Sequence, residues 1–224
     1  MCIRDSAIDT GIEENILVIG DSSGKSTLLR NMIHRISEGI PPSDAKLLVI
    51  DYRRQLLGEC PATHLAGYAS TKQDVQEFIS QLVPLLESRM PAGVDDPQTL
   101  RDRSWWKGPD IFLVVDDYDL VATSSGNPLQ GLLELLPYGR DIGLHMVVAR
   151  RCTGFSRTSF EPIMARLREL HPTIFLMSGT AEEGIIAGGR KARSLSKGRA
   201  DVISNQGTHQ VVQFAHHVGE EKTE

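Results

Sequence analysis

Residues 20–27 combine the backbone and side-chain types that bind the phosphates of a nucleotide. The stretch consists of Gly20, Asp21, Ser22, Ser23, Gly24, Lys25, Ser26 and Thr27. Glycine lets backbone amides approach phosphate oxygens closely, lysine supplies a compact positive charge, and a serine hydroxyl can ligate Mg²⁺. We predict that this stretch binds ATP, with Ser26 at the Mg²⁺ ion. Lys25 is predicted to reach the β- and γ-phosphates, which also makes it a candidate catalytic residue.

The spacing of this phosphate-binding loop is shorter than usual. The common motif has four residues between its two glycines, whereas three residues separate Gly20 from Gly24. Because the loop must wrap around the β-phosphate, a missing residue redirects an amide or moves the start of the helix. Each misdirected hydrogen bond to a charged group costs about 1–3 kcal/mol. The sequence therefore leaves open whether ATP is bound weakly, hydrolysed slowly or not bound.

Two adjacent carboxylates follow the apolar run 111–115. They are Asp116 and Asp117, at the C-terminal end of a predicted strand, where ligands bind in open α/β sheets. We predict that Asp116 holds Mg²⁺ through water and that Asp117 orients or deprotonates the attacking water. For either acid alone, the alternative role is a cap at the end of the strand.

Three arginines flank the apolar run 144–149. Arg140 precedes it, and Arg150 and Arg151 follow it. Arg150 is predicted to contact a nucleotide phosphate as a catalytic residue, in its own chain or across a subunit boundary. The alternative is a solvated surface or an ion pair with a neighbouring aspartate, Asp117 or Asp119, and the sequence does not decide between them.

Short apolar runs that alternate with amphipathic segments predict the scaffold for these residues, an α/β fold with a mainly parallel sheet flanked by helices. The predicted strands are 16–19, 47–50, 111–115, 144–149 and 173–177. The predicted helices are 71–90, with a possible kink at Pro84, 127–136 and 161–170. A C-terminal β-hairpin is predicted over 199–204 and 209–215.

Composition narrows the classes of function. The chain has 224 residues and a formal net charge of −5, so it lacks the broad positive field that attracts DNA. No apolar stretch is long enough to cross a bilayer, which argues against direct membrane insertion. We predict one domain over residues 15–215, a non-native or disordered leader over 1–14 and a polar tail over 216–224.

Several stretches resemble the FtsK/SpoIIIE family of ring-forming motor ATPases, and more closely the C-terminal ATPase-like domain of the EccC family of type VII (ESX) secretion. The resemblance covers about residues 12–215. Besides the loop 20–27, it is carried by the stretches 100–110, 114–121, 139–151, 176–179 and 197–199. The most specific parts are Ser-Trp-Trp at 104–106 and Asp-Asp-Tyr-Asp-Leu-Val at 116–121. The two tryptophans are either anchors for a partner helix or packed beneath the loop that leads to residue 110.

The resemblance implies a RecA-like P-loop core in a hexamer-forming assembly at the inner, cytoplasmic face of the cell membrane. Its partners would be secreted WXG100-type substrates, recognised by a signal on their tails, together with other ATPase domains and membrane components of the secretion complex. Two alternatives remain at this stage. One is an FtsK-type motor that translocates DNA, and the other is a non-hydrolysing adaptor with a relic phosphate loop.

Overall fold

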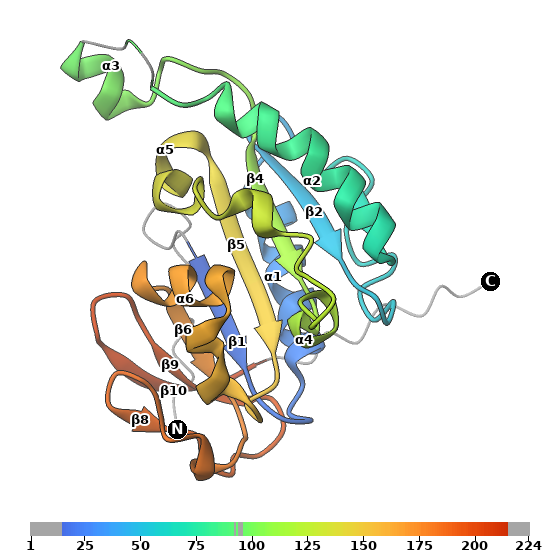
Figure 1. Cartoon of the computed structure of the whole chain (residues 1–224), viewed down its shortest axis with the longest axis vertical. Coiled ribbons are helices and arrows are strands. Elements are labelled where there is room, and N and C mark those ends of the chain that lie inside the picture. Colours follow the sequence, from blue (N-terminus) through green and yellow to red (C-terminus); the bar gives the residue numbers. More distant parts are fainter. Residues whose placement is uncertain (1–14, 92, 94–95, 215–224) are drawn as a thin grey trace.

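An eight-stranded sheet runs through the molecule in the order β10-β9-β6-β1-β5-β4-β2-β3 (Figure 1). The computed structural model describes residues 15–91, 93 and 96–214, so the predicted leader 1–14 and tail 216–224 lie outside the described residues. The strands of this sheet are β1 (Asn15–Ile19), β2 (Ala45–Ile50), β3 (Leu65–Ala69), β4 (Asp110–Val115), β5 (Leu144–Arg150), β6 (Thr173–Leu176), β9 (Arg199–Ile203) and β10 (His209–Gln213).

The strands from β6 to β3 in this order are parallel, and β9 and β10 are antiparallel to their neighbours. All parallel strands therefore end at one edge, called the carboxyl edge below, and begin at the opposite amino edge. A separate small hairpin is formed by β7 (Ile185–Ala187) and β8 (Arg190–Lys191). The mainly parallel sheet and the C-terminal hairpin agree with the prediction from sequence.

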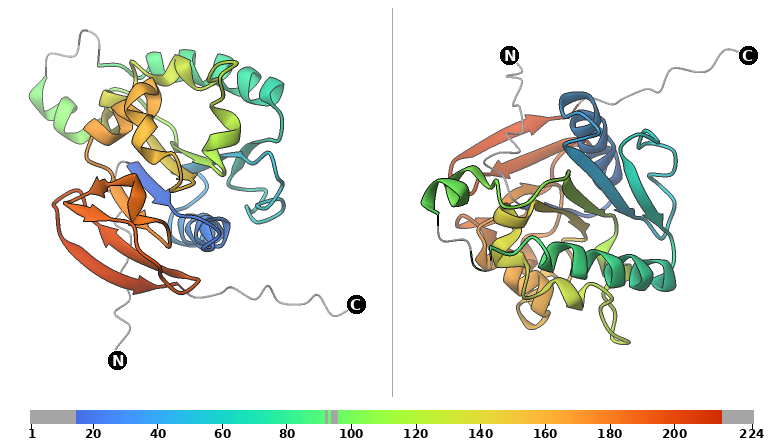
Figure 2. Two further views of the ribbon diagram at one scale, coloured as in Figure 1. Left: turned by 60° about the horizontal axis from the view of Figure 1, so that its bottom comes forward. Right: turned by 90° about the horizontal axis from the view of Figure 1, so that it is seen from above.

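Helices cover both faces of the sheet. They are α1 (Lys25–Gly39), α2 (Lys72–Glu87), α3 (Pro97–Asp102), α4 (Tyr118–Val121), α5 (Gly139–Ile142) and α6 (Pro162–Glu169), with 3₁₀ turns η1 (Gln130–Leu132), η2 (Leu136–Tyr138), η3 (Phe155–Phe160) and η4 (Ala181–Glu183). Figure 2 shows α1 on the face opposite α2 and α6. In Figure 1, α3 and α5 lie at the amino edge and α4 at the carboxyl edge.

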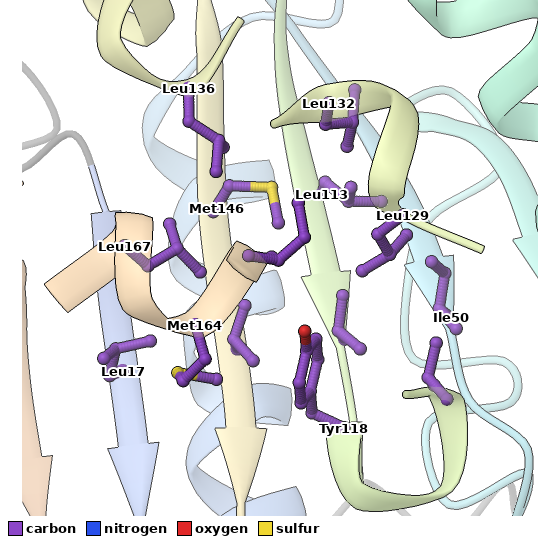
Figure 3. Close-up of a cluster of buried hydrophobic side chains, with 14 of the residues drawn as sticks. Leu17, Ile50, Leu113, Tyr118, Leu129, Leu132, Leu136, Met146, Met164 and Leu167 are labelled. Carbon is purple, nitrogen blue, oxygen red and sulfur yellow. The ribbon is translucent and has the colours of Figure 1, made fainter. Parts of the chain in front are cut away.

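Alternation along the central strands sends side chains into two buried layers. One layer packs beneath α2, η1 and α6, and the other beneath α1. Figure 3 shows the first layer, where Leu113 and Met146 of the sheet meet Leu132 of η1 and Met164 and Leu167 of α6. These dry contacts fix the strand ends, and with them the loops of the carboxyl edge.

The predicted helix 127–136 is wrong, because the chain forms the separate turns η1 and η2 there. Gly131 disfavours a helix, and a Cβ at that position would come within 3.2 Å of Val83. The side-chain amide of Asn127 also donates hydrogen bonds to Tyr118 and Glu161, away from the start of a local helix. The other predicted helices are present but shorter, with Pro84 inside α2.

Candidate functional site

The phosphate-binding loop begins as a continuation of the sheet. The amide of Gly20 donates to the carbonyl of Arg150 on β5 at 3.2 Å, and the amide of Asp21 donates to the carbonyl of Ser178 after β6 at 2.7 Å. A Cβ on Gly20 would lie 2.5 Å from Ser23 Oγ, so the close packing here requires glycine. The first two predicted binding residues thus use their amides to anchor the loop.

The rest of the loop turns sharply and leaves its amides available. Ser22 and Gly24 are left-handed, with φ of 47° and 99°, and α1 begins at Lys25. Among the described residues, the amides of 22–27 have no hydrogen-bond acceptor. Free amides in a turn that opens a helix of this length form an anion site. The shortened turn thus contains two left-handed residues, Ser22 and Gly24.

The side chains of the loop divide into structural and available ones. The carboxylate of Asp21 accepts hydrogen bonds from the amides of Cys152 and Thr153, at 3.1 and 3.3 Å, and from the Thr153 hydroxyl at 3.0 Å. The carboxylate of Asp21 therefore anchors the loop to the segment after β5, and its role in nucleotide binding stays a prediction. By contrast, Lys25 forms no ion pair within the described chain.

Ser26 and Asp116 meet, as the prediction of a shared metal site requires. Ser26 Oγ donates to Asp116 Oδ2 at 2.6 Å, and the amide of Asp117 donates to Asp116 Oδ1 at 2.9 Å. Burial raises the pKa of Asp116, as do the charges of Asp117 and Asp51, while the hydrogen bond from Ser26 opposes the rise. A hydroxyl beside a carboxylate is a donor set that suits Mg²⁺.

Asp117 lies beside this pair in a strained backbone conformation. Its φ is 46°, which is uncommon for a residue other than glycine and is typical of functional sites. Its carboxylate pairs with Arg53, with Oδ2 3.2 Å from Nε. Asp117 is at the edge of the site where a water-orienting acid is predicted, and its role in catalysis stays a prediction.

Arg150 ends β5, between the strands that carry the loop and the acid pair. It is 7% exposed, and its Nη2 lies 2.8 Å from Asp119 Oδ1. Of the alternatives that the sequence left open for Arg150, the structure shows an ion pair with Asp119. A phosphate contact by Arg150 stays a prediction. The guanidinium of Arg151 lies further from Asp119 Oδ2, at 3.9 Å, although the backbone amide of Arg151 donates to the same oxygen at 2.8 Å.

Arg140 does not join these arginines. It lies in α5, before β5, whereas Arg150 ends that strand. A strand rises about 3.3 Å per residue, so the length of β5 separates them by roughly 20 Å. Arg140 therefore belongs to the amino edge.

The sequence reasoning missed two parts of the carboxyl edge. Asp51 directly follows β2 and is 1% exposed, and the rule that found Asp116, an acid after a buried strand, would have found it too. The second part is a partly buried bridge to α6, in which Tyr118 donates to Glu161 at 2.7 Å and Asn127 donates to both at 2.8 Å. No spacing in the sequence indicates this bridge.

Both tryptophans of the quoted motif pack against the body of the protein at the amino edge. The guanidinium of Arg89 donates to the carbonyls of Pro109 and Ile142 at 3.0 Å each and lies 4.2 Å from the ring centroid of Trp106. The indole of Trp105 donates to the carbonyl of Arg89 at 2.7 Å, and that of Trp106 to a carbonyl of α5 at 2.8 Å. This arginine–tryptophan cluster holds the segment that leads into β4.

Proteins similar in sequence to this chain belong to type VII secretion systems. The chain is 46% identical over 210 residues to the ESX-4 secretion system protein EccC4 of Mycobacterium tuberculosis, which covers 93% of this chain and 17% of that relative. It therefore spans about a sixth of the relative's length. A scan against models of protein families found no match.

Solved structures agree. The cytoplasmic domain of the Thermomonospora curvata type VII secretion ATPase EccC superposes with a TM-score of 0.91 at 39% identity, over 95% of this chain and 25% of that one. ATPases 2 and 3 of the same protein, in complex with a signal sequence peptide, give the same TM-score and identity over 95% of this chain and 38% of theirs. The RecA-like P-loop fold predicted from the sequence is thereby confirmed. Within residues 15–91, 93 and 96–214, no helix is long and apolar enough to span a bilayer.

Proposed function

Because this chain belongs to the EccC ATPases of type VII secretion, a branch of the FtsK/SpoIIIE-like P-loop ATPases, we propose that it binds Mg·ATP at its carboxyl edge. The observation that carries the proposal is the 2.6 Å hydrogen bond from Ser26 to Asp116 beside the available amides of residues 22–27. These amides and Lys25 suit the phosphates, and the hydroxyl and carboxylate suit the metal ion. When bound, Mg²⁺ would neutralise charge on the phosphates.

We propose that hydrolysis by this site is slow. Asp117 would orient the attacking water, but its carboxylate is paired with Arg53, and an aspartate reaches less far than a glutamate. Arg150 would reach a phosphate only by giving up part of its 2.8 Å pair with Asp119. Both features reduce turnover more than binding.

Calorimetric titration with Mg·ATP tests this proposal on three proteins: the wild type, Lys25→Ala, and a variant with one glycine inserted between Ser22 and Ser23. We expect Lys25→Ala to bind at least tenfold more weakly, which corresponds to about 1.4 kcal/mol. The insertion restores the usual spacing and should bring the Kd into the micromolar range, about −8 kcal/mol. Measurable binding by the wild type that is unchanged in Lys25→Ala would refute the site.

The comparison of the wild type with the insertion variant separates the remaining alternatives. If only the insertion variant binds, the loop length is decisive and the natural chain works as an adaptor. If both bind alike, the left-handed turn at Ser22 and Gly24 already supplies a competent loop. Binding by neither would leave the adaptor with a relic loop as the better description.

We also propose that the domain recruits secreted proteins of the WXG100 type through a signal sequence. The support is the similarity to EccC ATPases 2 and 3 that were solved with a signal sequence peptide. A groove of about 510 Å³ between α6, β6 and the β7–β9 region offers apolar walls, including Ala165, Ile174 and Ile186, and the oppositely charged side chains of Arg168 and Glu169. An extended peptide with an apolar anchor would fit these walls.

Fluorescence anisotropy with a labelled signal-sequence peptide tests the groove. Ala165→Arg should fill it from α6 and weaken binding at least tenfold, whereas Gln76→Arg, on the exposed surface of α2, should leave the affinity unchanged. If Ala165→Arg and Gln76→Arg bind the peptide with equal affinity, the peptide binds outside this groove.

In the whole secretion machine, we propose that the domain works on the cytoplasmic side of the membrane, in a hexamer with other ATPase domains and membrane components. The DNA-translocating alternative is disfavoured by the net charge of −5. A duplex affinity that falls steeply between 50 and 200 mM salt in the same assay would revive it.

A further inference from the structure

Asp51 and Asp116 are neighbours on adjacent strand ends. Ile50 pairs with Val115 in the parallel ladder of β2 and β4, and the amide of Asp116 donates to the carbonyl of Ile50 at 2.9 Å. Asp51 and Asp116 are the next pair along, and paired residues on strands about 4.8 Å apart direct their side chains to the same face. Both are 1% exposed, so two carboxylates are buried side by side.

The face they share is the face covered by α1. Asp116 accepts from Ser26 in the first turn of α1, and Asp51 packs next to Leu56 and Tyr68, which belong to the apolar layer beneath α1. Asp51 therefore faces the same space as the hydroxyl and the carboxylate proposed to hold the metal ion.

One oxygen of Asp51 has no donor. Oδ2 accepts from the amide of Leu56 at 2.6 Å and from the hydroxyl of Tyr68 at 2.8 Å. Oδ1 is buried and without a hydrogen-bond partner among the described residues. A buried carboxylate oxygen without a donor destabilises the fold. Asparagine could accept the same two hydrogen bonds at its amide oxygen, although more weakly, so the geometry of these contacts does not by itself require a carboxylate.

No cation in the described chain compensates the pair. Neither Asp51 nor Asp116 forms an ion pair there, and Arg53 is occupied by Asp117. Residues 15–91, 93 and 96–214 also contain no group of three or more His, Cys, Asp or Glu side chains that could hold an ion unaided. Mg²⁺ typically uses one or two carboxylates, retained waters and substrate phosphates, which is the situation these residues fit.

We infer that Asp51 is a positioning residue of the divalent-cation site, whose Oδ1 accepts a hydrogen bond from a water molecule that the ion retains. The inference rests on the proposed binding of nucleotide. Ser26 and Asp116 face the ion, and Asp51 orients its hydration shell from the β2 side. Since the protein groups alone are too few, the ion binds firmly only when nucleotide phosphates are present.

Direct titration of Mn²⁺, followed by electron paramagnetic resonance with saturating ADP, tests this inference without measuring activity. Asp51→Asn keeps the acceptor for Leu56 and Tyr68 but removes the charge, and we expect its Mn²⁺ affinity to fall by 10–100-fold. The matched control is Asp110→Asn, the same change at the amino end of β4, which should stay within twofold of the wild type. ADP binding in EDTA should be equal in all three proteins.

Thermal unfolding in EDTA gives the second readout. Asp51→Asn should be at least as stable as the wild type, because the change removes an uncompensated buried charge. A merely structural Asp51 would give a lower midpoint. Mn²⁺ affinity within twofold of the wild type, or an equal loss of ADP affinity in EDTA, would overturn the inference. A wild type that binds no ADP in either buffer would refute the nucleotide site itself, and this inference with it.

Discussion

The carboxylates at the two ends of β4 have opposite electrostatic surroundings. At the amino edge, Asp110 lies 3.2 Å from His145 and 3.7 Å from Arg103, next to the arginine–tryptophan cluster. At the carboxyl edge, Asp116 has a hydroxyl and an amide but no cation in the described chain, and two further acids stand nearby. Compensated charge at one edge serves stability, whereas uncompensated charge at the other marks a place prepared for a ligand.

The backbone amides repeat this contrast. At the carboxyl edge, the amides of residues 22–27 lack acceptors among the described residues. Left-handed residues other than glycine do not distinguish the edges, because Asp117 lies at one and Arg103 at the other. At the amino edge, a single guanidinium donates to the carbonyls of Pro109 and Ile142.

The largest effect on stability is expected at Arg89, and its absence would contradict the comparison of the two edges. Arg89→Met removes the donor of two carbonyls and the cation above Trp106, so the free energy of unfolding should fall by about 3 kcal/mol. Chemical denaturation measures this loss, with Arg101→Met on the exposed surface of α3 as the control. A loss below 1 kcal/mol would show that the amino edge is not the stabilising one.

Asp110→Asn should destabilise the protein by about 1–2 kcal/mol at neutral pH. Burial alone would raise the pKa of Asp110, but the hydrogen bond and charge of His145 and the charges of Arg103 and Arg89 outweigh burial and lower it. The ionised form therefore stabilises the fold at neutral pH, and this contribution is lost as the pH falls through the lowered pKa. In the variant, the free energy of unfolding should therefore fall less steeply than in the wild type as the pH is lowered through this range.

Asp116→Asn should change the stability in the opposite direction to Asp110→Asn. Because the pKa of Asp116 is raised, its ionised form disfavours the fold, and protonation at falling pH relieves the cost. In EDTA the variant should gain about 1 kcal/mol at pH 7, and the gain should shrink on acidification. Urea denaturation at several pH values checks this, and a loss of stability at pH 7 would place Asp116 with the structural acids.

The smallest effect is expected at Arg140, which sharpens the division between the edges. Arg140→Ala changes an exposed side chain in α5, far from the loop, so stability should stay within about 0.5 kcal/mol. Its Mg·ATP affinity, measured by calorimetry, should match that of the wild type. A clear loss of affinity would return Arg140 to the nucleotide site.

The parts of the fold that could be predicted are those with local signals. The strands β1, β2, β4, β5 and β6 are apolar runs, and the loop 20–27 and the pair Asp116–Asp117 adjoin two of them. The strand β3 lacks such a run, because Gly67 stands at its centre, where a Cβ would come within 2.6 Å of Phe78. Its packing against α2 is a tertiary property that no window of sequence reveals.

Side-chain partners were the least predictable feature of the site. Arg140, Arg150 and Arg151 are close in sequence, yet β5 carries the first away from the others. The choice of Asp119 over Asp117 as the partner of Arg150 depends on the direction of the short helix α4, which follows the left-handed Asp117. Spacing alone fixes neither.

The order of the strands also dictates when this domain can assemble. The first strand, β1, lies between β5 and β6, and Asn15 meets Met146 at a separation of 131 residues. During synthesis, β1 therefore has no neighbour in the sheet until β5, 131 residues further along the chain, has been made. Contacts of such long range slow folding and expose apolar segments meanwhile. The nucleotide loop, which follows β1 and is hydrogen-bonded to Ser178 and Gly198, is consequently among the last parts of the domain to acquire its shape.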